Sequence, residues 1–250
     1  MQLAIAVFTL VAYGCAGYLW WRDGTANYVI ALLAGQLGTL LSPLWQFLYR
    51  FAYTGTGVPA LAYLGHSLPR SAFFGGWLMI LPAIFIFFLY RARWWFPGYT
   101  TGLLTFVVFV VYHLLGETLG VRLGVWQYDE SIVLPFGLRL TLLAALMNGL
   151  VSFGMLSLML LTRRYGLTSL LLLLLPAPFI LMLFVRGLLG APLYTALLLQ
   201  SHNLASSWAT FLGAVGTLAL LLWSAHTIAS VLEGQQTSQP ITGGRAQSQI

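Results

Sequence analysis

The sequence has little charge, and it contains no lysine at all. Only 6% of its 250 residues are charged and 60% are hydrophobic, whereas soluble domains carry about a quarter charged residues. Without lysine no retinal Schiff base can form, so a retinal protein is excluded. Cys15 is the one cysteine of the chain, so an intramolecular disulfide and a cysteine-based metal motif are excluded as well.

Long apolar runs fill most of the chain. They are about 20 residues long, the length that a helix needs to cross a bilayer, whereas a transmembrane barrel shows alternating segments of about 10 residues. We therefore predict an all-α integral membrane protein, a bundle of about seven transmembrane helices. The predicted spans are Leu3–Trp20, Tyr28–Tyr49, Ala72–Tyr90, Gly98–Thr118, Leu134–Leu161, Thr168–Val185 and Leu204–Leu232. Residues 1–233 form a single transmembrane domain in this prediction, and the polar residues 234–250 form a disordered tail.

The arginines indicate how the chain is oriented. The N-terminus lacks the positive region of a signal peptide, so we interpret it as the first membrane helix. The odd-numbered loops and the tail carry six arginines, namely Arg22, Arg91, Arg93, Arg163, Arg164 and Arg245. The even-numbered loops carry Arg50, Arg70, Arg122 and Arg186, with Arg139 at the start of the fifth span. Because arginine is enriched in cytoplasmic loops, this pattern favours an N-terminus outside.

Two connecting segments are too apolar for exposed loops. The second loop, "FAYTGTGVPALAYLGHSLPR", is broken by glycine and proline, and the sixth loop, "GLLGAPLYTALLLQSHN", has the same character. We expect re-entrant or interfacial segments in both places.

The reactive side chains gather on one side of the predicted bundle. Loops two, four and six must lie on the same side, whichever side that is. They carry, or lie just above, the residues His66, His113, Glu117, Asp129, Glu130 and His202. The other side has Asp23, His226 and Glu233. This distribution does not depend on the orientation, and it predicts the functional site on the side of the even-numbered loops.

Glu117 is the first candidate for a catalytic residue. It stands near the end of an apolar helix, four residues after His113, so the two side chains share a helix face. His113 is therefore a catalytic candidate as well. An ionisable group within a membrane is a functional candidate, and a partly desolvated carboxyl can act as a general acid. The alternative is that Glu117 lies just outside the hydrocarbon and pairs with Arg122 or another loop arginine. Asp129 and Glu130 are candidates for a second acid or base, with solvated loop acids as the alternative.

A metal site is the competing interpretation of the same cluster. His113 and Glu117 offer two ligands for a divalent metal, and His66 or His202 offers a third. The sequence contains no HExxH spacing. We therefore predict no metal, and, since no glycine-rich phosphate loop is present, no soluble cofactor.

Aromatic and polar residues around these acids are candidates for substrate contacts. Tyr112, Trp126 and Tyr128 can present ring faces to an apolar ligand or to a developing cation. His66 and His202 are candidates on the same side. Asn148, within the fifth span, is a further candidate, for which a hydrogen bond between helices is the alternative explanation.

A short segment of the chain resembles a known group of proteins. Glu117 at a helix end, the spaced Gly120 and Gly124, and the pair Trp126 and Tyr128 are similar to multi-span membrane proteins of carotenoid and terpenoid metabolism. The resemblance covers about residues 112–135. It implies a membrane-embedded enzyme, such as a cyclase or hydratase, acting on an isoprenoid.

Three functions follow as hypotheses. The first is an intramembrane enzyme that uses acid–base chemistry on a lipid or isoprenoid. The second is a non-catalytic membrane subunit of a larger complex, or a pigment- or lipid-binding protein. A transporter ranks third, because no internal repeat is seen. The expected partners are membrane lipids, an apolar lipid or isoprenoid ligand and other membrane proteins, but not nucleic acid.

Overall fold

The computed structural model describes residues 2–54, 58–129, 139–202, 204 and 206–237, which are mostly helical. The described elements are, in chain order, α1 (Gln2–Asp23), α2 (Asn27–Gly38), the 3-10 helix η1 (Thr39–Leu41), α3 (Ser42–Tyr49), β1 (Phe51–Tyr53), β2 (Pro59–Tyr63), β3 (His66–Pro69), α4 (Arg70–Phe74), the 3-10 helix η2 (Gly76–Met79), α5 (Leu81–Arg91), α6 (Tyr99–Arg122), β4 (Trp126–Tyr128), α7 (Leu140–Leu161), α8 (Leu167–Leu174), α9 (Ala177–Met182), the π-helical segment η4 (Leu183–Leu189), α10 (Ala191–Ser201) and α11 (Ser207–Thr237).

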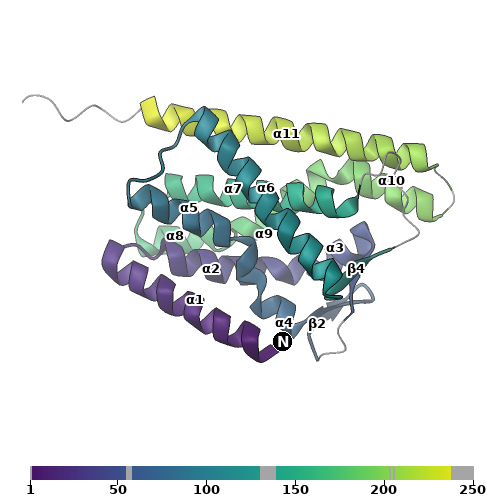
Figure 1. Cartoon of the computed structure of the whole chain (residues 1–250), viewed down its shortest axis with the longest axis horizontal. Coiled ribbons are helices and arrows are strands. Elements are labelled where there is room, and N and C mark those ends of the chain that lie inside the picture. Colours follow the sequence, from purple (N-terminus) through teal and green to yellow (C-terminus); the bar gives the residue numbers. More distant parts are fainter. Residues whose placement is uncertain (1, 55–57, 130–138, 203, 205, 238–250) are drawn as a thin grey trace, which may run out of the picture.

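Six helical segments within the described residues are long and apolar enough to cross a membrane. They are Ala4–Asp23, Asn27–Tyr49, Tyr99–Arg122, Leu140–Leu161, Leu167–Leu189 and Ser207–Gly234. The mostly helical prediction is thereby confirmed, and the six apolar segments are consistent with a multi-pass membrane protein. In Figure 1 most of the helices extend roughly along the long axis of the molecule, and α6 crosses at a steeper angle.

The third predicted span, Ala72–Tyr90, is not one helix. The chain there forms the short helix α4, the 3-10 helix η2 and then α5, which has 11 residues. A helix of that length is about 16 Å long, well short of the roughly 30 Å hydrocarbon core. Glycines at positions 75 and 76 and Pro82 in the first turn of α5 lie where the helix is interrupted, and both residue types disfavour a helix interior.

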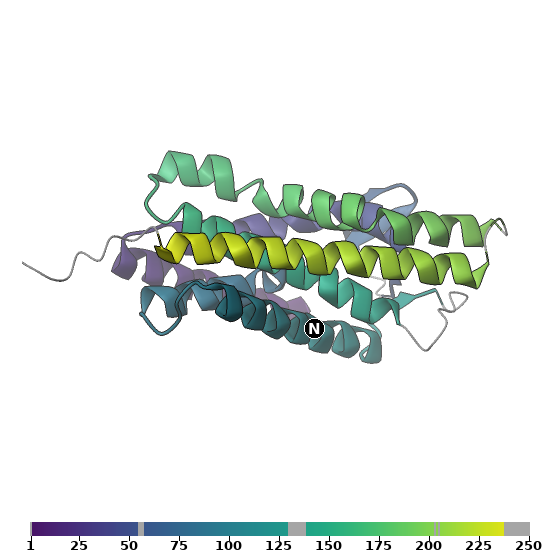
Figure 2. The same ribbon diagram turned by 90° about the horizontal axis from the view of Figure 1, so that it is seen from above.

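Helix α7 is the centre of the bundle. Helices α5, α6, α9 and α11 contact it, and most of its side chains are buried. Figure 2 shows α11 above this core, running the length of the molecule. The polar residues Asn148 and Ser152 of α7 are buried too, so this helix brings hydrogen-bonding groups into the interior.

The segments expected to be re-entrant or interfacial form regular structure. In the second loop β1 pairs antiparallel with β4, which follows α6, while β2 pairs with β3. In the sixth loop α10 forms a helix that packs against α11. Figure 1 shows α3, β4 and α10 at one end of the molecule, where α10 and α11 extend furthest. Helix α11 has 31 residues, or about 46 Å at 1.5 Å per residue, so it is longer than a hydrocarbon core requires.

The end of α11 overlaps the predicted tail. The helix continues to Thr237, whereas the tail was predicted from residue 234. The remaining tail residues, 238–250, lie outside the described residues, as do Glu130 and the start of the predicted fifth span.

Candidate functional site

A turn after α6 brings two aromatic side chains back onto that helix. The helix continues to Arg122, beyond the predicted end at Thr118. Gly124 then adopts a left-handed conformation with φ of 62°, which glycine tolerates without strain, and the amide of Val125 donates to the carbonyl of Gly120 at 2.9 Å. The chain therefore reverses directly into β4.

Pairing of β4 with β1 fixes which side chains face α6. Tyr128 is opposite Phe51, Gln127 opposite Ala52 and Trp126 opposite Tyr53. Alternate side chains of a strand point to opposite faces. Trp126 and Tyr128 are accordingly both partly buried, while Gln127 between them is exposed.

Glu117 is a buried carboxylate that accepts three hydrogen bonds. Its side chain is 9% exposed. The indole Nε1 of Trp126 and the hydroxyl of Tyr128 donate to Oε2 at 3.1 and 2.9 Å, and Nδ2 of Asn148 donates to Oε1 at 3.2 Å. An indole nitrogen can only donate. Glu117 is therefore held as an acceptor, in the arrangement that suits its ionised form.

Arg186 supplies the opposite charge. Its Nη2 donates to Oδ1 of Asn148 at 2.6 Å. A guanidinium only donates, so the oxygen of the Asn148 amide must face Arg186 and its nitrogen must face Glu117. Asn148 thus bridges a guanidinium and a carboxylate inside the bundle. The hydroxyl of Tyr49 donates to the carbonyl of Arg186 at 2.5 Å, and the arginine lies in the π-helical segment η4, a local geometry frequent at functional sites.

His113 belongs to a second polar contact of α6. The single hydroxyl hydrogen of Ser152 is donated to the carbonyl of Met79 at 2.6 Å, so Ser152 Oγ accepts from Nε2 of His113 at 2.8 Å. Nε2 therefore carries the proton and does not offer a lone pair. Tyr112, the preceding residue, donates to the carbonyl of Leu78 at 3.0 Å. Tyr112 therefore connects α6 to the interrupted third segment directly, and His113 does so through Ser152 of α7.

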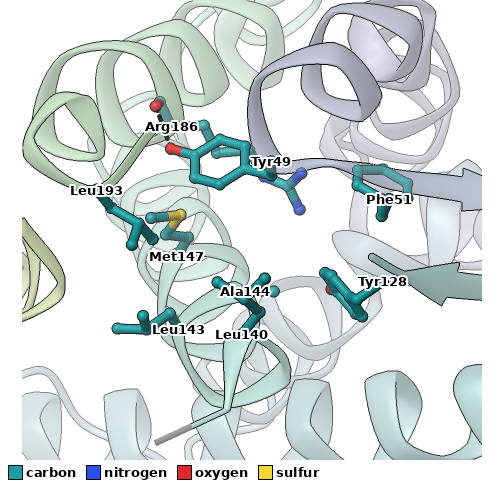
Figure 3. Close-up of a pocket in the computed structure, with 9 residues that line it drawn as sticks. All are labelled: Tyr49, Phe51, Tyr128, Leu140, Leu143, Ala144, Met147, Arg186 and Leu193. Atoms are coloured by element: carbon teal, nitrogen blue, oxygen red, sulfur yellow. Dashed lines mark hydrogen bonds between the residues drawn. The ribbon is translucent and has the colours of Figure 1, made fainter. Parts of the chain in front are cut away.

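A small cavity of about 20 Å³ lies beside Arg186. Figure 3 shows its guanidinium pointing into the space between Tyr49, Phe51 and Tyr128. Nε of Arg186 is buried and has no hydrogen-bond partner in the described structure. A cavity of this size has room for about one water molecule.

A much larger, open cavity of about 540 Å³ lies on the outer side of Tyr128 and Phe51. Its wall consists of Gln46, Phe47, Arg50, Phe51, Ala52, His66, Gln127, Tyr128, Asp129, Leu198 and His202. These residues come from α3, β1, β3, β4, α10 and the residues adjoining them. Tyr128 lines both cavities and donates to Glu117, so it separates the buried carboxylate from the open cavity.

An ion pair lies in the wall of the large cavity. Nη2 of Arg50 is 3.0 Å from Oδ2 of Asp129, and both side chains are about one-third exposed. The amide of Asp129 also donates to the carbonyl of Arg50 at 2.9 Å, which continues the β1–β4 ladder by one residue. Side-chain and main-chain contacts therefore hold the same two residues together.

Burial raises the pKa of two tyrosines in the β1–β4 sheet, Tyr128 and Tyr53. Burial raises the pKa of Tyr128 well above its ordinary value of 10.0, and the charge of Glu117 and the hydrogen bond to it raise that pKa further. Burial also raises the pKa of Tyr53, whose hydroxyl shares a hydrogen bond with Ser42 at 3.1 Å. Both phenols remain protonated at neutral pH, so Tyr128 has a proton to donate to Glu117.

The structure divides the predicted site residues into three groups. Glu117, Trp126, Tyr128 and Asn148 form one hydrogen-bonded cluster, which we call the Glu117 cluster. The residues His66, Asp129 and His202, together with Tyr128, line the large cavity. His113 and Tyr112 form their hydrogen bonds away from both, and Glu130 lies outside the described residues.

Sequence reasoning missed two arginines. Arg186 was counted as a charge of the sixth loop, but it lies in the candidate span Leu167–Leu189 and bonds to Asn148. The signal was its place in "LMLFVRGLLG", since an ionisable residue flanked by apolar ones is a functional candidate in a membrane protein. Arg50 was counted only for orientation, and its ion pair with Asp129 depends on a strand pairing that the sequence did not suggest.

The described residues show no cluster suited to a metal. No group of three histidine, cysteine, aspartate or glutamate residues in this part of the chain lies close enough together to hold an ion. Comparison of the chain with protein-family models, with curated proteins and with solved structures returned no match. The function must therefore be argued from the geometry of the site.

Gly120 offers a test of the contact between α6 and β4. A Cβ at this position would overlap the six-membered ring of the Trp126 indole. We expect Gly120→Ala to lower the free energy of unfolding by about 1–3 kcal/mol, as overpacking does. Thermal unfolding of the purified protein in detergent measures the effect.

Gly116 is the matched control, one turn earlier on the same helix. A Cβ there would meet nothing within 4 Å. Gly116→Ala should leave stability unchanged or raise it by up to about 1 kcal/mol, because alanine favours the helix. Equal effects of the two substitutions would contradict the close approach of Trp126.

A double-mutant cycle tests the bridged charges. Glu117→Gln leaves Arg186 without its counter-charge, and Arg186→Gln leaves Glu117 without its own. We expect each single variant to be destabilised and the double variant to be less destabilised than the sum, by about 1–3 kcal/mol. Because Asn148 separates the charges, this coupling is smaller than that of a direct buried pair. Additive effects in thermal unfolding would show that the two charges are independent.

The raised pKa of Tyr128 makes the stability of the folded protein depend on pH. Its folded pKa exceeds the unfolded value of about 10, so its contribution to stability is complete below pH 10 and declines as the pH rises toward the folded pKa. Tyr128→Phe should therefore cost about 1.5–3 kcal/mol at pH 7–9, the range for a hydrogen bond to a charged group, and the difference from the wild type should narrow above pH 10. Unfolding measured across this range, with the exposed Tyr165→Phe as control, checks the trend. A difference that widens above pH 10 would reverse the assigned sign.

Proposed function

We propose that this chain is an intramembrane enzyme that performs acid–base chemistry on a lipid or isoprenoid substrate. One observation carries the proposal. Glu117 is buried and accepts hydrogen bonds from three side chains. One of these donors, Tyr128, also lines an open cavity of about 540 Å³. A carboxylate next to a ligand-sized cavity, separated from it by a tyrosine, suits proton transfer.

Tyr128 gives the carboxylate a route to the cavity. The phenol oxygen can accept a proton from a bound substrate while its own proton passes to Glu117, so the phenol ends neutral and Glu117 ends protonated. The reverse transfer delivers a proton from Glu117 to the substrate. Glu117 therefore serves as the base in one direction of transfer and as the acid in the other. The sequence alone had suggested the acid.

Other residues complete the proposed machinery. Asp129 lines the cavity and is the candidate for the second acid or base, while His66 and His202 contact the substrate. Arg186 and Asn148 position Glu117 and balance its charge. His113 and Tyr112 have a positioning role on α6, since their hydrogen bonds go to Ser152 and Leu78. No metal and no soluble cofactor are part of this chemistry.

The proposed topology has seven passes with the N-terminus outside. The third pass is then the interrupted segment formed by α4, η2 and α5, and the other six are the long apolar segments. The excess of arginine in the odd-numbered loops supports this orientation. The large cavity lies on the non-cytoplasmic side, at the level where α10 and α11 extend beyond the other helices.

A non-catalytic protein is the second candidate, either a subunit of a larger membrane complex or a protein that binds a pigment or lipid. One observation favours it: Glu117 already has three donors and a bridged counter-charge, as a purely structural carboxylate would. A transporter ranks third, since no internal repeat supports it.

Replacement of Glu117 by glutamine tests the enzymatic proposal. Membranes that contain the protein are supplied with candidate isoprenoids, and product formation is followed by chromatography. We expect Glu117→Gln to lower turnover by about 100-fold or more, the usual contribution of a general acid or base. Glu233→Gln is the control, because this exposed acid lies in the C-terminal part of α11 and takes no part in the Glu117 cluster.

Two further measurements make the result decisive. A monodisperse elution profile and an intact unfolding transition show that the Glu117→Gln protein is folded. Tyr128→Phe keeps the carboxylate but removes the relay, and it should lower turnover as well. Unchanged turnover in Glu117→Gln excludes Glu117 as the acid–base group. A subunit or pigment that co-purifies with an inactive wild-type protein supports the second candidate.

A further inference from the structure

The wall of the large cavity is apolar in its inner part, nearer the helical bundle, and polar in its outer part. Helix α3 ends at Tyr49, just before Arg50, and α10 ends at Ser201, just before His202. Both helices run outward toward this end of the molecule (Figure 1), so Phe47 and Leu198 lie nearer the bundle than Arg50 and His202. Phe47 is 45% exposed and its ring lies 6.4 Å from the ring of His66. The inner part of the wall therefore offers apolar and aromatic surface.

The outer part of the wall is polar but carries no net formal charge. Its charged groups are Arg50 and Asp129, which pair at 3.0 Å and so compensate each other. Gln127 is exposed on β4, and its amide can both donate and accept hydrogen bonds. The imidazoles of His66 and His202 can do the same in their neutral form. Among the residues of the rim that the structure describes, donors and acceptors thus occur together, and Arg50 and Asp129 form a pair.

This distribution of charge selects among possible ligands. A phosphate or carboxylate entering the cavity would lose water without meeting a free counter-charge, because Arg50 is already paired with Asp129. Removing an unpaired charge from water is far more costly than removing a hydroxyl that finds a hydrogen-bond partner. A hydroxyl needs one donor and one acceptor, and the rim supplies both.

We propose that the large cavity binds the uncharged, hydroxyl-bearing head of an amphiphilic isoprenoid or lipid, with its hydrocarbon chain directed along Phe47 and Leu198 toward the membrane. This rests on the proposed function and names the class of its substrate. The head group then lies against Tyr128, on the opposite side of that residue from Glu117. The exposed Arg70, Arg122 and Arg139 lie at the same end but outside the cavity wall. These arginines can attract anions to this end, but they would not hold an anion inside the cavity.

Farnesol and farnesyl phosphate are suitable probes, because they share a chain and differ in the charge of the head. Binding of each to the purified full-length chain in uncharged detergent is measured by equilibrium dialysis with labelled ligand. We expect saturable binding of farnesol and binding of farnesyl phosphate weaker by about tenfold or more. Equal or tighter binding of the phosphate would overturn the charge class. Absence of saturable farnesol binding would overturn the proposal as a whole.

A substitution at Ala52 tests whether farnesol binds in the large cavity. It lies exposed on β1 in the cavity wall, so Ala52→Trp fills the cavity without entering the core. Ala62→Trp is the matched control, because Ala62 of β2 is also exposed and lies outside the wall. We expect Ala52→Trp to weaken farnesol binding by about tenfold and Ala62→Trp to leave it unchanged. Wild-type affinity in Ala52→Trp would show that farnesol binds elsewhere.

The Glu117→Gln protein separates this proposal from the catalytic one. Glu117 does not belong to the cavity wall, so the variant should bind farnesol with wild-type affinity. Farnesol binding with full turnover in Glu117→Gln would refute the catalytic role and leave the binding site standing. Loss of the preference for farnesol over its phosphate, with turnover still dependent on Glu117, would refute only the ligand class.

Discussion

A carboxylate cannot be buried among apolar helices unless other groups compensate its charge, and the geometry of this end of the molecule follows from that requirement. Glu117 on α6 receives Trp126 and Tyr128 from β4 and Asn148 from α7, and Arg186 of η4 reaches it through Asn148. Three segments, β4, α7 and η4, are thus directed at a single charge on a fourth, α6. Displacing any of them would leave a donor, an acceptor or a full charge unpaired in the interior.

The same carboxylate links the interior to the polar end of the molecule. On one side of Tyr128 lie the buried charges and a cavity with room for about one water molecule. On the other side lies an open cavity whose own charges are paired. The β1–β4 sheet keeps Tyr128 between these two environments, and Gly124 allows the turn that brings β4 there. The hydrogen bond from Tyr128 to Glu117 therefore lies between the buried interior and the open cavity.

The sequence predicted what depends on apolar length and on short separations along the chain. Runs of about 20 apolar residues predicted the helical segments of the six candidate spans. The proximity of Glu117 to Trp126 and Tyr128 was within reach too, because the pair follows the glutamate after a turn that Gly120 and Gly124 mark. The interrupted third segment was not predicted, because averaged apolar character over Ala72–Tyr90 conceals two glycines and a proline that divide it.

What depends on contacts between distant segments could not be predicted. The bond of Asn148 to both Glu117 and Arg186 requires the crossing of α6, α7 and η4, and each of these residues alone had a simpler explanation. The pairing of β1 with β4 joins segments about 75 residues apart, as their register shows, and no local pattern specifies such a partner. The wall of the large cavity depends on that pairing and on α10, so it could be seen only in the structure. The sequence did point to three of its residues, His66, Asp129 and His202, as candidate site residues.

The order of the charged residues along the chain bears on how the protein is made. Chains enter the membrane from the N-terminus as they are synthesised, so the helix with Glu117 arrives before α7, and η4 arrives later still. The carboxylate meets its Asn148 donor one helix later and the Arg186 charge only when the next segment has inserted. During that interval it must keep a proton or remain near water. The contacts around Glu117 can therefore be completed only after η4 has been synthesised.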